Sequence, residues 1–328
     1  MVATSLVLSV AVVLTGLVAA IEHEADRAVE AVGADRWLVD ASSVGPFSNG
    51  APFPAALADT VASQAGVTRA EPMLFAAQAV ALDGPEPMIV MGVQPGGLAD
   101  PSAQAAAKLT NPGDAIVDAR SGLDVGDTVH IGRSNLRVVA TVDGRTMLGG
   151  VPVLFASLSD VQDALLLGQP LATSIVVQGT PGAVPDGLKA MTAGEVRDDA
   201  LLVLRRVLDS LAFLRVLMWL VAGAIVASVV YLSALERSRD FAVFKATGAS
   251  TASIGGGVVM QAVVLAIGAA VVAGLLASLV APRFPIPVSV PARSFLVVIL
   301  VAAVVGSAAS TFGLVRVARA EPALAFGG

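Results

Sequence analysis

Four long runs of apolar residues separate one large polar block from the rest of the chain. A helix needs roughly 20 apolar residues to cross a hydrocarbon core of about 30 Å, and each run reaches that length. Apolar stretches of about 10–14 residues are more typical of buried core helices, so we interpret all four runs as transmembrane helices. They cover residues 1–21, 211–235, 254–280 and 294–315.

The first run has a second interpretation, as a cleaved secretory signal peptide. Val18-Ala19-Ala20 resembles a small-residue cleavage site, but no basic residue precedes the apolar run. We therefore expect the run to be retained as a helix. The short start also suggests that a cytoplasmic leading segment is absent or was lost from this N-terminus.

Small residues recur at four-residue spacing in the later runs, for example Gly223 with Ala227 and Gly274 with Ser278. Such spacing lets membrane helices pack closely. No run has an Asp, Glu, Lys or His near its middle. An ion-coupled carrier normally needs such groups, so this pattern disfavours a secondary transporter.

The polar block at 22–210 predicts a mixed α+β domain between two helical stalks. Alternating apolar and polar positions indicate strands, and Gly33 is a natural stop for the helix that leaves the first run. Strands are predicted at 37–41, 73–81, 87–93, 115–118, 128–131, 136–142, 153–156 and 174–178, and helices at 22–36, 54–65, 159–167 and 195–210, the last running straight into the second span.

Charge is distributed in the same two parts. Residues 22–209 carry 23 acidic and 12 basic side chains, whereas the remainder carries 3 acidic and 8 basic ones. Because basic residues favour the cytoplasmic side in short loops, both termini should be cytoplasmic and residues 22–210 extracytoplasmic. The comparison rests on five basic residues in 236–253 and the tail 316–328 (Arg237, Arg239, Lys245, Arg316, Arg319) against two in the loop 281–293 (Arg283, Arg293).

The composition leaves little room for catalysis or nucleic-acid binding. The chain has no cysteine and two histidines, His23 in an exposed acidic helix and His130 in a strand, so a metal centre is not expected. It contains no GxxxxGK[ST], HExxH or GxSxG motif, and we expect neither an enzyme nor a bound cofactor. A net charge of −6 disfavours a nucleic-acid partner.

The segment between the second and third runs reads ERSRDFAVFKATGAS at 236–250. It predicts a short helix ending at Gly248, with Phe241 and Phe244 on one face. Such a helix lies at the membrane interface or docks in a groove of a cytoplasmic partner.

This segment resembles a signature of the FtsX-like permeases of ABC transporters, of the MacB and DevC type. RVARAEPALAFGG at 316–328 resembles the closing pattern of that family, and GLDVGDTVHIGRSNLRVVATV at 122–142 resembles a strand region of the MacB-type periplasmic core. Asp240 and Thr247 depart mildly from the family signature. The missing basic segment before the first helix is a larger departure.

The resemblance implies a four-helix permease with a MacB-type extracytoplasmic domain in a bacterial cell membrane. Residues 236–253 then hold a coupling helix for a separate ATPase subunit, which binds the ATP and magnesium. The implied contact residues are Phe241, Val243 and Phe244 as apolar anchors, Glu236, Arg237, Arg239, Asp240 and Lys245 as polar contacts, and Gly248 as the helix stop. Members work as homodimers or heterodimers, and the helices pass the ATPase motion to the outer domain, which is mechanotransmission.

Two functions remain open on these grounds. The first is export or extraction of a lipid, lipoprotein, peptide or drug. The second is a transmembrane regulator that activates an extracytoplasmic partner, such as a cell-wall hydrolase. The apolar segment 44–54 fits a lipid-contacting loop or a docking patch, but an internally packed loop is the simpler expectation.

Overall fold

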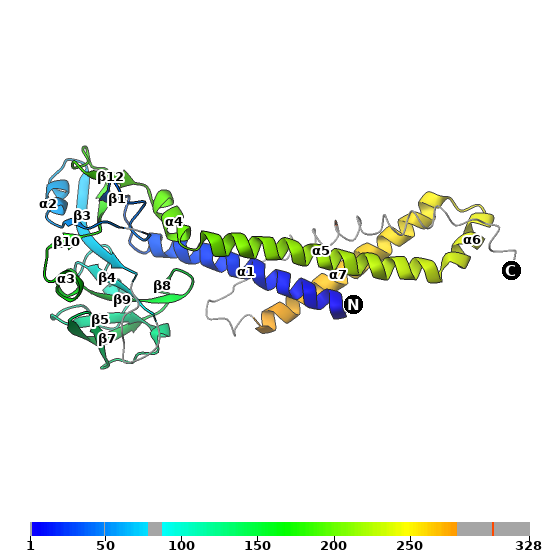
Figure 1. Ribbon diagram of the computed structural model, residues 1–328, viewed down its shortest axis with the longest axis horizontal. Helices are drawn as coiled ribbons and strands as arrows, with labels where there is room; N and C mark the ends of the chain where they lie inside the picture. The colour runs from blue at the N-terminus through cyan, green and yellow to red at the C-terminus, as the bar shows by residue number, and fades with distance from the viewer. Residues whose placement is uncertain (1, 49, 78–86, 281–303, 305–328) are drawn as a thin grey trace. The chain divides into compact units, whose positions relative to one another are not determined.

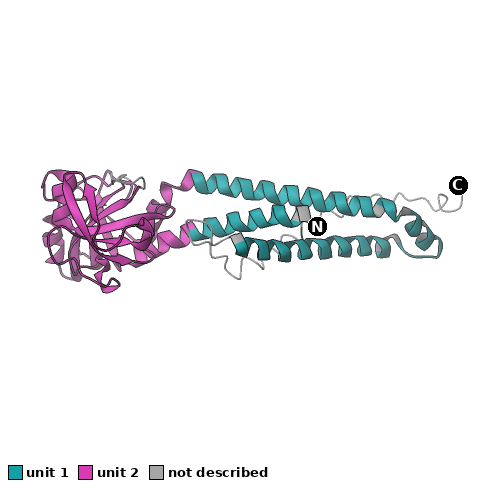
Figure 2. Ribbon diagram, turned by 90° about the horizontal axis from the view of Figure 1, so that it is seen from below, with its two compact units in different colours: residues 1–20, 207–328 teal, residues 21–206 magenta. Residues whose placement is uncertain are grey.

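A computed structural model describes residues 2–48, 50–77, 87–280 and 304. The chain divides into two compact units (Figure 2). We name residues 1–20 with 207–328 unit 1 and residues 21–206 unit 2.

Unit 1 is helical (Figure 1). Its elements come from α1 (Val2–Glu30), α5 (Arg205–Glu236), α6 (Ser238–Ala246) and α7 (Thr251–Val280). Three stretches are long and apolar enough to cross a membrane, namely Ser5–Glu30, Arg205–Ser233 and Ser253–Ala277. Three of the four expected spans are thus confirmed by length and composition. The fourth, at 294–315, lies outside the described residues apart from Val304, as do the loop 281–293 and the tail 316–328.

Alanine side chains form the packing surface of α7. Ala266, Ala270 and Ala273 are buried in one cluster with Val12 of α1 and Ala222 of α5. Because small side chains let helix backbones approach closely, these alanines let α7 pack closely against α1 and α5.

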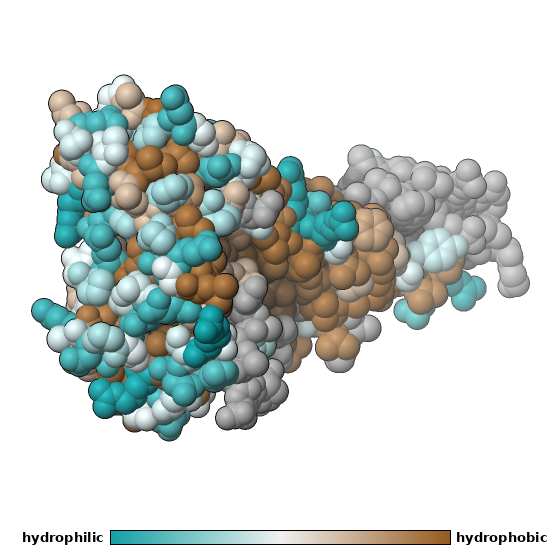
Figure 3. Space-filling model, turned by 60° about the vertical axis from the view of Figure 1, so that its left-hand side comes forward, coloured by the Kyte–Doolittle hydropathy of each residue, from teal (hydrophilic) through white to brown (hydrophobic). Residues whose placement is uncertain are grey.

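The outward surfaces of α5 and α7 are apolar. Phe213 and Leu220 of α5 and Met260 of α7 are each more than 60% exposed. In the face shown in Figure 3, hydrophobic side chains gather on the helices and hydrophilic ones on unit 2. Such surfaces suit lipid or another membrane helix, whereas the surface of unit 2 suits water.

Unit 2 is built on a mixed ten-stranded sheet. The order is β12-β1-β11-β3-β4-β9-β5-β7-β6, with β8 pairing β9. The β4–β9 and β5–β7 pairs are parallel and the other pairs antiparallel, including the small β10–β2 ribbon. The strands are β1 (Arg36–Asp40), β2 (Phe53–Pro54), β3 (Val67–Ala76), β4 (Ile89–Val93), β5 (Asp114–Asp118), β6 (Thr128–Ile131), β7 (Ser134–Val142), β8 (Thr146–Met147), β9 (Val151–Ser157), β10 (Leu171–Ala172), β11 (Ser174–Gly179) and β12 (Leu188–Met191).

Helices cover both faces of this sheet. The helices are the unit 2 part of α1, α2 (Leu57–Ala62), α3 (Leu158–Leu166) and α4 (Ala193–Leu202), with short 3-10 turns at Pro101–Ala103 and Ala119–Ser121. Side chains of a strand alternate between faces, so Phe155 of β9 joins a core with α1 and α4 while Leu154 joins a core with α3. The predicted mixed architecture of strands and helices is confirmed.

Most predicted elements of unit 2 are present, and the boundaries of the confirmed ones lie within two residues of the prediction. The strands predicted at 37–41, 87–93, 115–118, 128–131, 136–142, 153–156 and 174–178 and the helix at 159–167 are confirmed as β1, β4, β5, β6, β7, β9, β11 and α3. The helix predicted over 22–36 ends at Glu30, and Gly33 takes a positive φ of 64° just after it.

Three further predictions need correction. The helix over 54–65 is shorter, from Leu57 to Ala62. The strand predicted at 73–81 begins at Val67 and ends at Ala76, and residues 78–81 of that prediction lie outside the described residues. The helix over 195–210 is interrupted, because α4 ends at Leu202 and α5 begins at Arg205. At this break the Leu204 amide donates to the Leu201 carbonyl, a tighter i to i−3 bond than the helical one. The two-residue strands β2, β8 and β10 escaped prediction because two residues show no alternation.

Candidate functional site

A break in the helix on each side separates the short helix α6 from α5 and α7. Arg237 separates α5 from α6, and its amide still donates to the Ser233 carbonyl over 3.2 Å. At the other end Gly248 has a φ of 97°, which a side chain would strain, and the Ala249 amide bonds the Phe244 carbonyl at 2.9 Å. The Ser250 hydroxyl then accepts from the Ser253 amide at 3.1 Å and begins α7.

The aromatic residues of α6 have different surroundings. Phe241 is half-buried and packs against a cluster of Val226 and Val230 from α5 and Val258 from α7. Phe244 is 53% exposed and Val243 is 47% exposed. Phe241 therefore seats α6 on the membrane helices, while Val243 and Phe244 form an exposed apolar pair.

The other residues of the implied contact surface lie around this pair. Glu236 is the last residue of α5, and the side chains of Arg237, Arg239 and Asp240 are exposed. Of Lys245 only the backbone is described, as part of α6. The exposed members are Glu236, Arg237, Arg239, Asp240, Val243, Phe244 and Gly248.

We expect Phe241→Ala to loosen α6. Truncating a fully buried Phe costs about 3–5 kcal/mol, so a half-buried one should cost about 2 kcal/mol. Amide hydrogen exchange across 238–246 should speed up in the full chain. The matched control is Phe244→Ala on the same helix, which should change that exchange less because the Phe244 side chain is 53% exposed.

In unit 2 a buried carboxylate ties α1 to the β8–β9 hairpin. Glu24 is 3% exposed, and its carboxylate accepts hydrogen bonds from the Thr146 hydroxyl and from the Gly149 amide at 2.8 Å and the Gly150 amide at 3.0 Å. The turn that supplies these amides is strained, since Leu148, a non-glycine residue, has a φ of 54°. We name this set of contacts the Glu24 clamp.

Sequence reasoning missed the Glu24 clamp. Residues 22–36 contain acidic residues throughout, and their polarity indicated an exposed helix. His23 is exposed as predicted, yet its neighbour Glu24 is buried. The only available signal is the Gly149-Gly150 pair, whose consecutive amides can bind an anion, but the sequence does not say which carboxylate they meet.

A second carboxylate and an ion pair hold α4 in place. The Arg197 guanidinium of α4 pairs with Asp26 of α1, and this hydrogen bond raises the pKa of Arg197 despite the opposing effect of burial. Asp199 is buried, and its carboxylate accepts from the Phe47 amide at 2.7 Å and from the Ser48 hydroxyl. Unit 2 thus holds both stalk segments, α1 and α4, by charged contacts.

The segment 44–54 packs internally. Phe47 is 2% exposed and stands edge-on to Trp37 and to Phe75. Gly45 is required for the approach of Asp199, because a Cβ there would lie 2.2 Å from the Asp199 Cγ. The expectation of an internally packed loop is confirmed for Phe47, Phe53 and the residues 45–46, whereas Val44 is 52% exposed and residue 49 lies outside the described residues.

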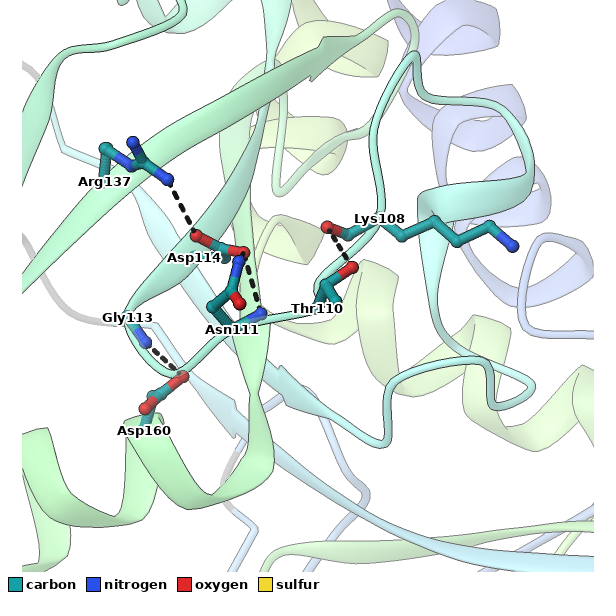
Figure 4. Close-up of polar contacts among 7 residues, drawn as sticks. All are labelled: Lys108, Thr110, Asn111, Gly113, Asp114, Arg137 and Asp160. Atoms are coloured by element: carbon teal, nitrogen blue, oxygen red, sulfur yellow. Dashed lines mark hydrogen bonds and ion pairs between the residues drawn. The ribbon is translucent and has the colours of Figure 1, made fainter.

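A polar cluster fixes the loop before β5 (Figure 4). Asp114 is 4% exposed; its Oδ2 accepts from the Asn111 amide at 2.9 Å, and its Oδ1 lies 3.5 Å from the Arg137 Nη2. Burial raises the pKa of Asp114, but the hydrogen bonds from Asn111 and Arg137 outweigh it, so the pKa lies below its ordinary value. The nearby Asp160 carboxylate accepts from the Gly113 amide at 3.0 Å.

This cluster predicts a loss of stability of unit 2 in acid. A carboxyl with a lowered native pKa stabilises the fold above its ordinary pKa, and the contribution disappears as the pH falls through the native value. In a Trp219→Phe background Trp37 is the only tryptophan and reports on unit 2. The urea concentration at the midpoint of its unfolding should decrease as the pH is lowered below about 4. This decrease should be smaller in the Asp114→Asn variant. Asp143→Asn, at an exposed carboxylate, should leave the slope unchanged; an equal effect would contradict the assignment.

Within the described residues no group of three or more His, Asp or Glu side chains could hold a metal ion. His130 lies in β6, as predicted, with its Nδ1 2.8 Å from the Asn135 Oδ1. The candidate functional surface of unit 1 is therefore the exposed pair on α6, and the Glu24 clamp is the main polar junction of unit 2.

These features define an α-helical membrane protein that carries a compact mixed α/β unit. The family model of the FtsX-like permease C-terminal region matches residues 212–322. The uncharacterized ABC transporter permease Rv2563 of Mycobacterium tuberculosis is 39% identical over 100% of this chain and 94% of its own length. A second permease from that organism, Rv0072, is 38% identical with the same coverage. The chain belongs to the FtsX-like ABC transporter permeases.

Two solved structures are also similar to this chain. The periplasmic region of MacB from Actinobacillus actinomycetemcomitans aligns with 51% of this chain and 93% of its own, at 13% identity and a TM-score of 0.37. The extracellular domain of the transporter YknZ from Gram-positive bacteria aligns with 48% of this chain and 98% of its own, at 12% identity and a TM-score of 0.35.

Proposed function

We propose that this chain is the membrane subunit of an ABC transporter that works by mechanotransmission. A separate ATPase subunit binds ATP and magnesium on the cytoplasmic side, and its closure moves the membrane helices. That motion drives unit 2 to export or extract a lipid, lipoprotein, peptide or drug. The family membership supports the permease role, and α6 supports the coupling.

The observation that carries this proposal is the arrangement of α6. Phe241 seats the helix on α5 and α7, so a force applied to α6 reaches both membrane helices. Val243 and Phe244 remain exposed on the same helix, as an anchor for a groove in a partner must be. Arginine side chains flank the pair and supply polar contacts at the rim.

Unit 2 has contacts suited to receiving the motion. The α1 helix is unbroken from Val2 to Glu30, and its residues Glu24 and Asp26 bind the β8–β9 hairpin and α4. A displacement of α1 is therefore passed to two separate elements of unit 2. The break at Val203–Leu204 gives the other stalk a point of bending.

The permease is further proposed to form a dimer and to have a defined orientation in the membrane. The apolar outward faces of α5 and α7 suit lipid and a second permease, as a homodimer or a heterodimer. We place the protein in the bacterial cell membrane with both termini cytoplasmic and residues 22–210 outside. We also propose that unit 2 binds a protein partner on the outer side and that the chain binds no nucleic acid.

The experiment for this proposal is an ATPase-stimulation assay on the purified permease–ATPase complex. Candidate lipids, lipoproteins, peptides and drugs are added to one series, and candidate outer-side proteins to another. Stimulation by a small substrate or lipoprotein supports export or extraction. Stimulation by a protein partner alone supports the second candidate, a transmembrane regulator that activates a partner such as a cell-wall hydrolase. That candidate is favoured only by the compact, charged surface of unit 2.

A further inference from the structure

One amide side chain interrupts the apolar sequence of the third membrane span. Gln261 lies in the N-terminal half of α7, inside the stretch that is long and apolar enough to cross a membrane. No other Asn or Gln occurs in the four apolar runs of the sequence. A primary amide that is left without partners in hydrocarbon costs free energy, so this residue needs a hydrogen bond in the membrane.

The structure gives Gln261 a partner on the neighbouring span. Its Nε2 donates a hydrogen bond to the Ser233 Oγ of α5 over 3.0 Å. Both side chains are half-buried. Hydrogen bonds of this kind between membrane helices add to the van der Waals packing that holds the helices together.

The pairing agrees with the direction of side chains on the two helices. Side chains of a helix lean toward its N-terminus, and α7 begins at the end that carries α6. Gln261 therefore leans toward α6, and Ser233 lies on that side, near the end of α5. Sliding α7 along α5 by one turn, about 5.4 Å, would separate the amide from the hydroxyl beyond hydrogen-bond range.

The hydrogen bond lies on the same helix faces as the cluster that seats α6. Val230 of α5 and Val258 of α7 are buried in this cluster, and Phe241 packs against it. Ser233 follows Val230 by one turn, and Gln261 follows Val258 by one turn, so each polar residue shares a face with its valine. Contacts between valines remain favourable after a slip of one turn, whereas the hydrogen bond does not. The polar pair therefore favours one register over its neighbours, as a single polar residue does in a coiled coil.

We propose that Gln261 is a positioning residue for the docking helix α6. Its bond to Ser233 sets the register of α5 against α7. Because α6 connects these two helices (Figure 1), their register decides where α6 presents Phe244. The consequence for an ATPase partner rests on the proposed function, whereas the register of the two helices does not.

The first test measures distances between spin labels on the full chain in lipid nanodiscs. The chain has no cysteine, so introduced cysteines are the only labelling sites. The pair Leu232→Cys with Val271→Cys joins the α6 end of α5 to the far half of α7 and reports on the register. The pair Asp240→Cys with Val271→Cys reports on the position of α6. All three side chains are exposed.

Gln261→Met removes the amide and keeps a long, flexible side chain that suits an apolar span. We expect a second population in both label pairs, displaced by about one helical turn, or roughly 5 Å. Ser233→Ala should produce the same population. Combining the two changes should add nothing further, because each one already removes the same bond.

Two more variants separate positioning from general packing. Ser228→Ala is the matched control, because the Ser228 hydroxyl donates to the Ala224 carbonyl of its own helix at 2.8 Å. Its label distances should equal those of the parent chain. The exchange variant Ser233→Gln with Gln261→Ser places the amide on α5, where it leans toward residue 261, and should restore the single population. A mere packing defect would not be repaired by this exchange.

The second test measures the affinity of the ATPase subunit for the same variants. Gln261→Met should lower it about three- to tenfold, the range expected for one hydrogen bond between membrane helices, and the exchange variant should restore it. Unchanged label distances in Gln261→Met, no recovery in the exchange variant, or an equal change in Ser228→Ala would overturn the proposal. If no ATPase binds the parent chain, the proposed function fails, and the label distances still decide the role of Gln261 in the register.

Discussion

The Phe244→Asp variant is expected to lose its ATPase subunit while still inserting into the membrane. Phe244 is the more exposed member of the apolar pair on α6, and aromatic anchors in a partner groove contribute about 2–4 kcal/mol to binding. Placing a carboxylate in that groove adds a desolvation cost. At 1.4 kcal/mol for each factor of ten, the affinity should fall at least about 100-fold.

Co-purification from detergent-solubilised membranes measures this effect. The matched control is Val125→Asp, which places the same charge at an exposed apolar residue of unit 2 and should leave the ATPase bound. Retention of the ATPase by Phe244→Asp at the level of the parent chain would remove α6 from the coupling role.

Glu24→Ala should strongly destabilise unit 2. Hydrogen bonds to a charged group contribute about 1.5–3 kcal/mol each, and their loss leaves the Thr146 hydroxyl and two glycine amides without a partner. We expect a loss of about 3–5 kcal/mol, in the range found when one partner of a buried charged contact is removed. The strained turn at Leu148 should open first, because Glu24 binds the amides that follow it.

Two measurements on the full chain check the Glu24 prediction. Urea unfolding followed by Trp37 fluorescence in the Trp219→Phe background gives the stability of unit 2, and amide exchange at Gly149 and Gly150 reports on the turn. Glu30→Ala removes an exposed carboxylate from the same helix and serves as the control. If Glu24→Ala and Glu30→Ala change the urea midpoint and the amide exchange equally, the buried carboxylate of Glu24 does not stabilise unit 2 through the clamp.

The elements with a strong periodic pattern could be predicted from the sequence. Long apolar runs predict membrane-length helices, and the alternation in β6 and β7 reflects one buried and one exposed side, as at His130 and Ile131. Two-residue strands and the break at Val203–Leu204 leave no such pattern. Both depend on tertiary contacts, since the residues at the break have ordinary helical propensity.

Only part of the candidate site could be predicted from the sequence. The helix α6 could be located from its apolar and charged residues. That Phe241 is half-buried while Phe244 is exposed depends on the packing of α5 and α7. Glu24 is one acidic residue among many in its segment. Its burial follows from the position of the β8–β9 hairpin, which lies more than 120 residues further along the chain.

The central claim is that this permease works with a separate ATPase, and affinity purification of the native full chain tests it most directly. Membranes are solubilised in several mild detergents, and the ratio of co-purifying proteins to the permease is quantified by mass spectrometry. We expect a P-loop ATPase in an amount equal to the permease. Absence of any such ATPase in every detergent would contradict the proposed coupling and favour a stand-alone membrane receptor or scaffold.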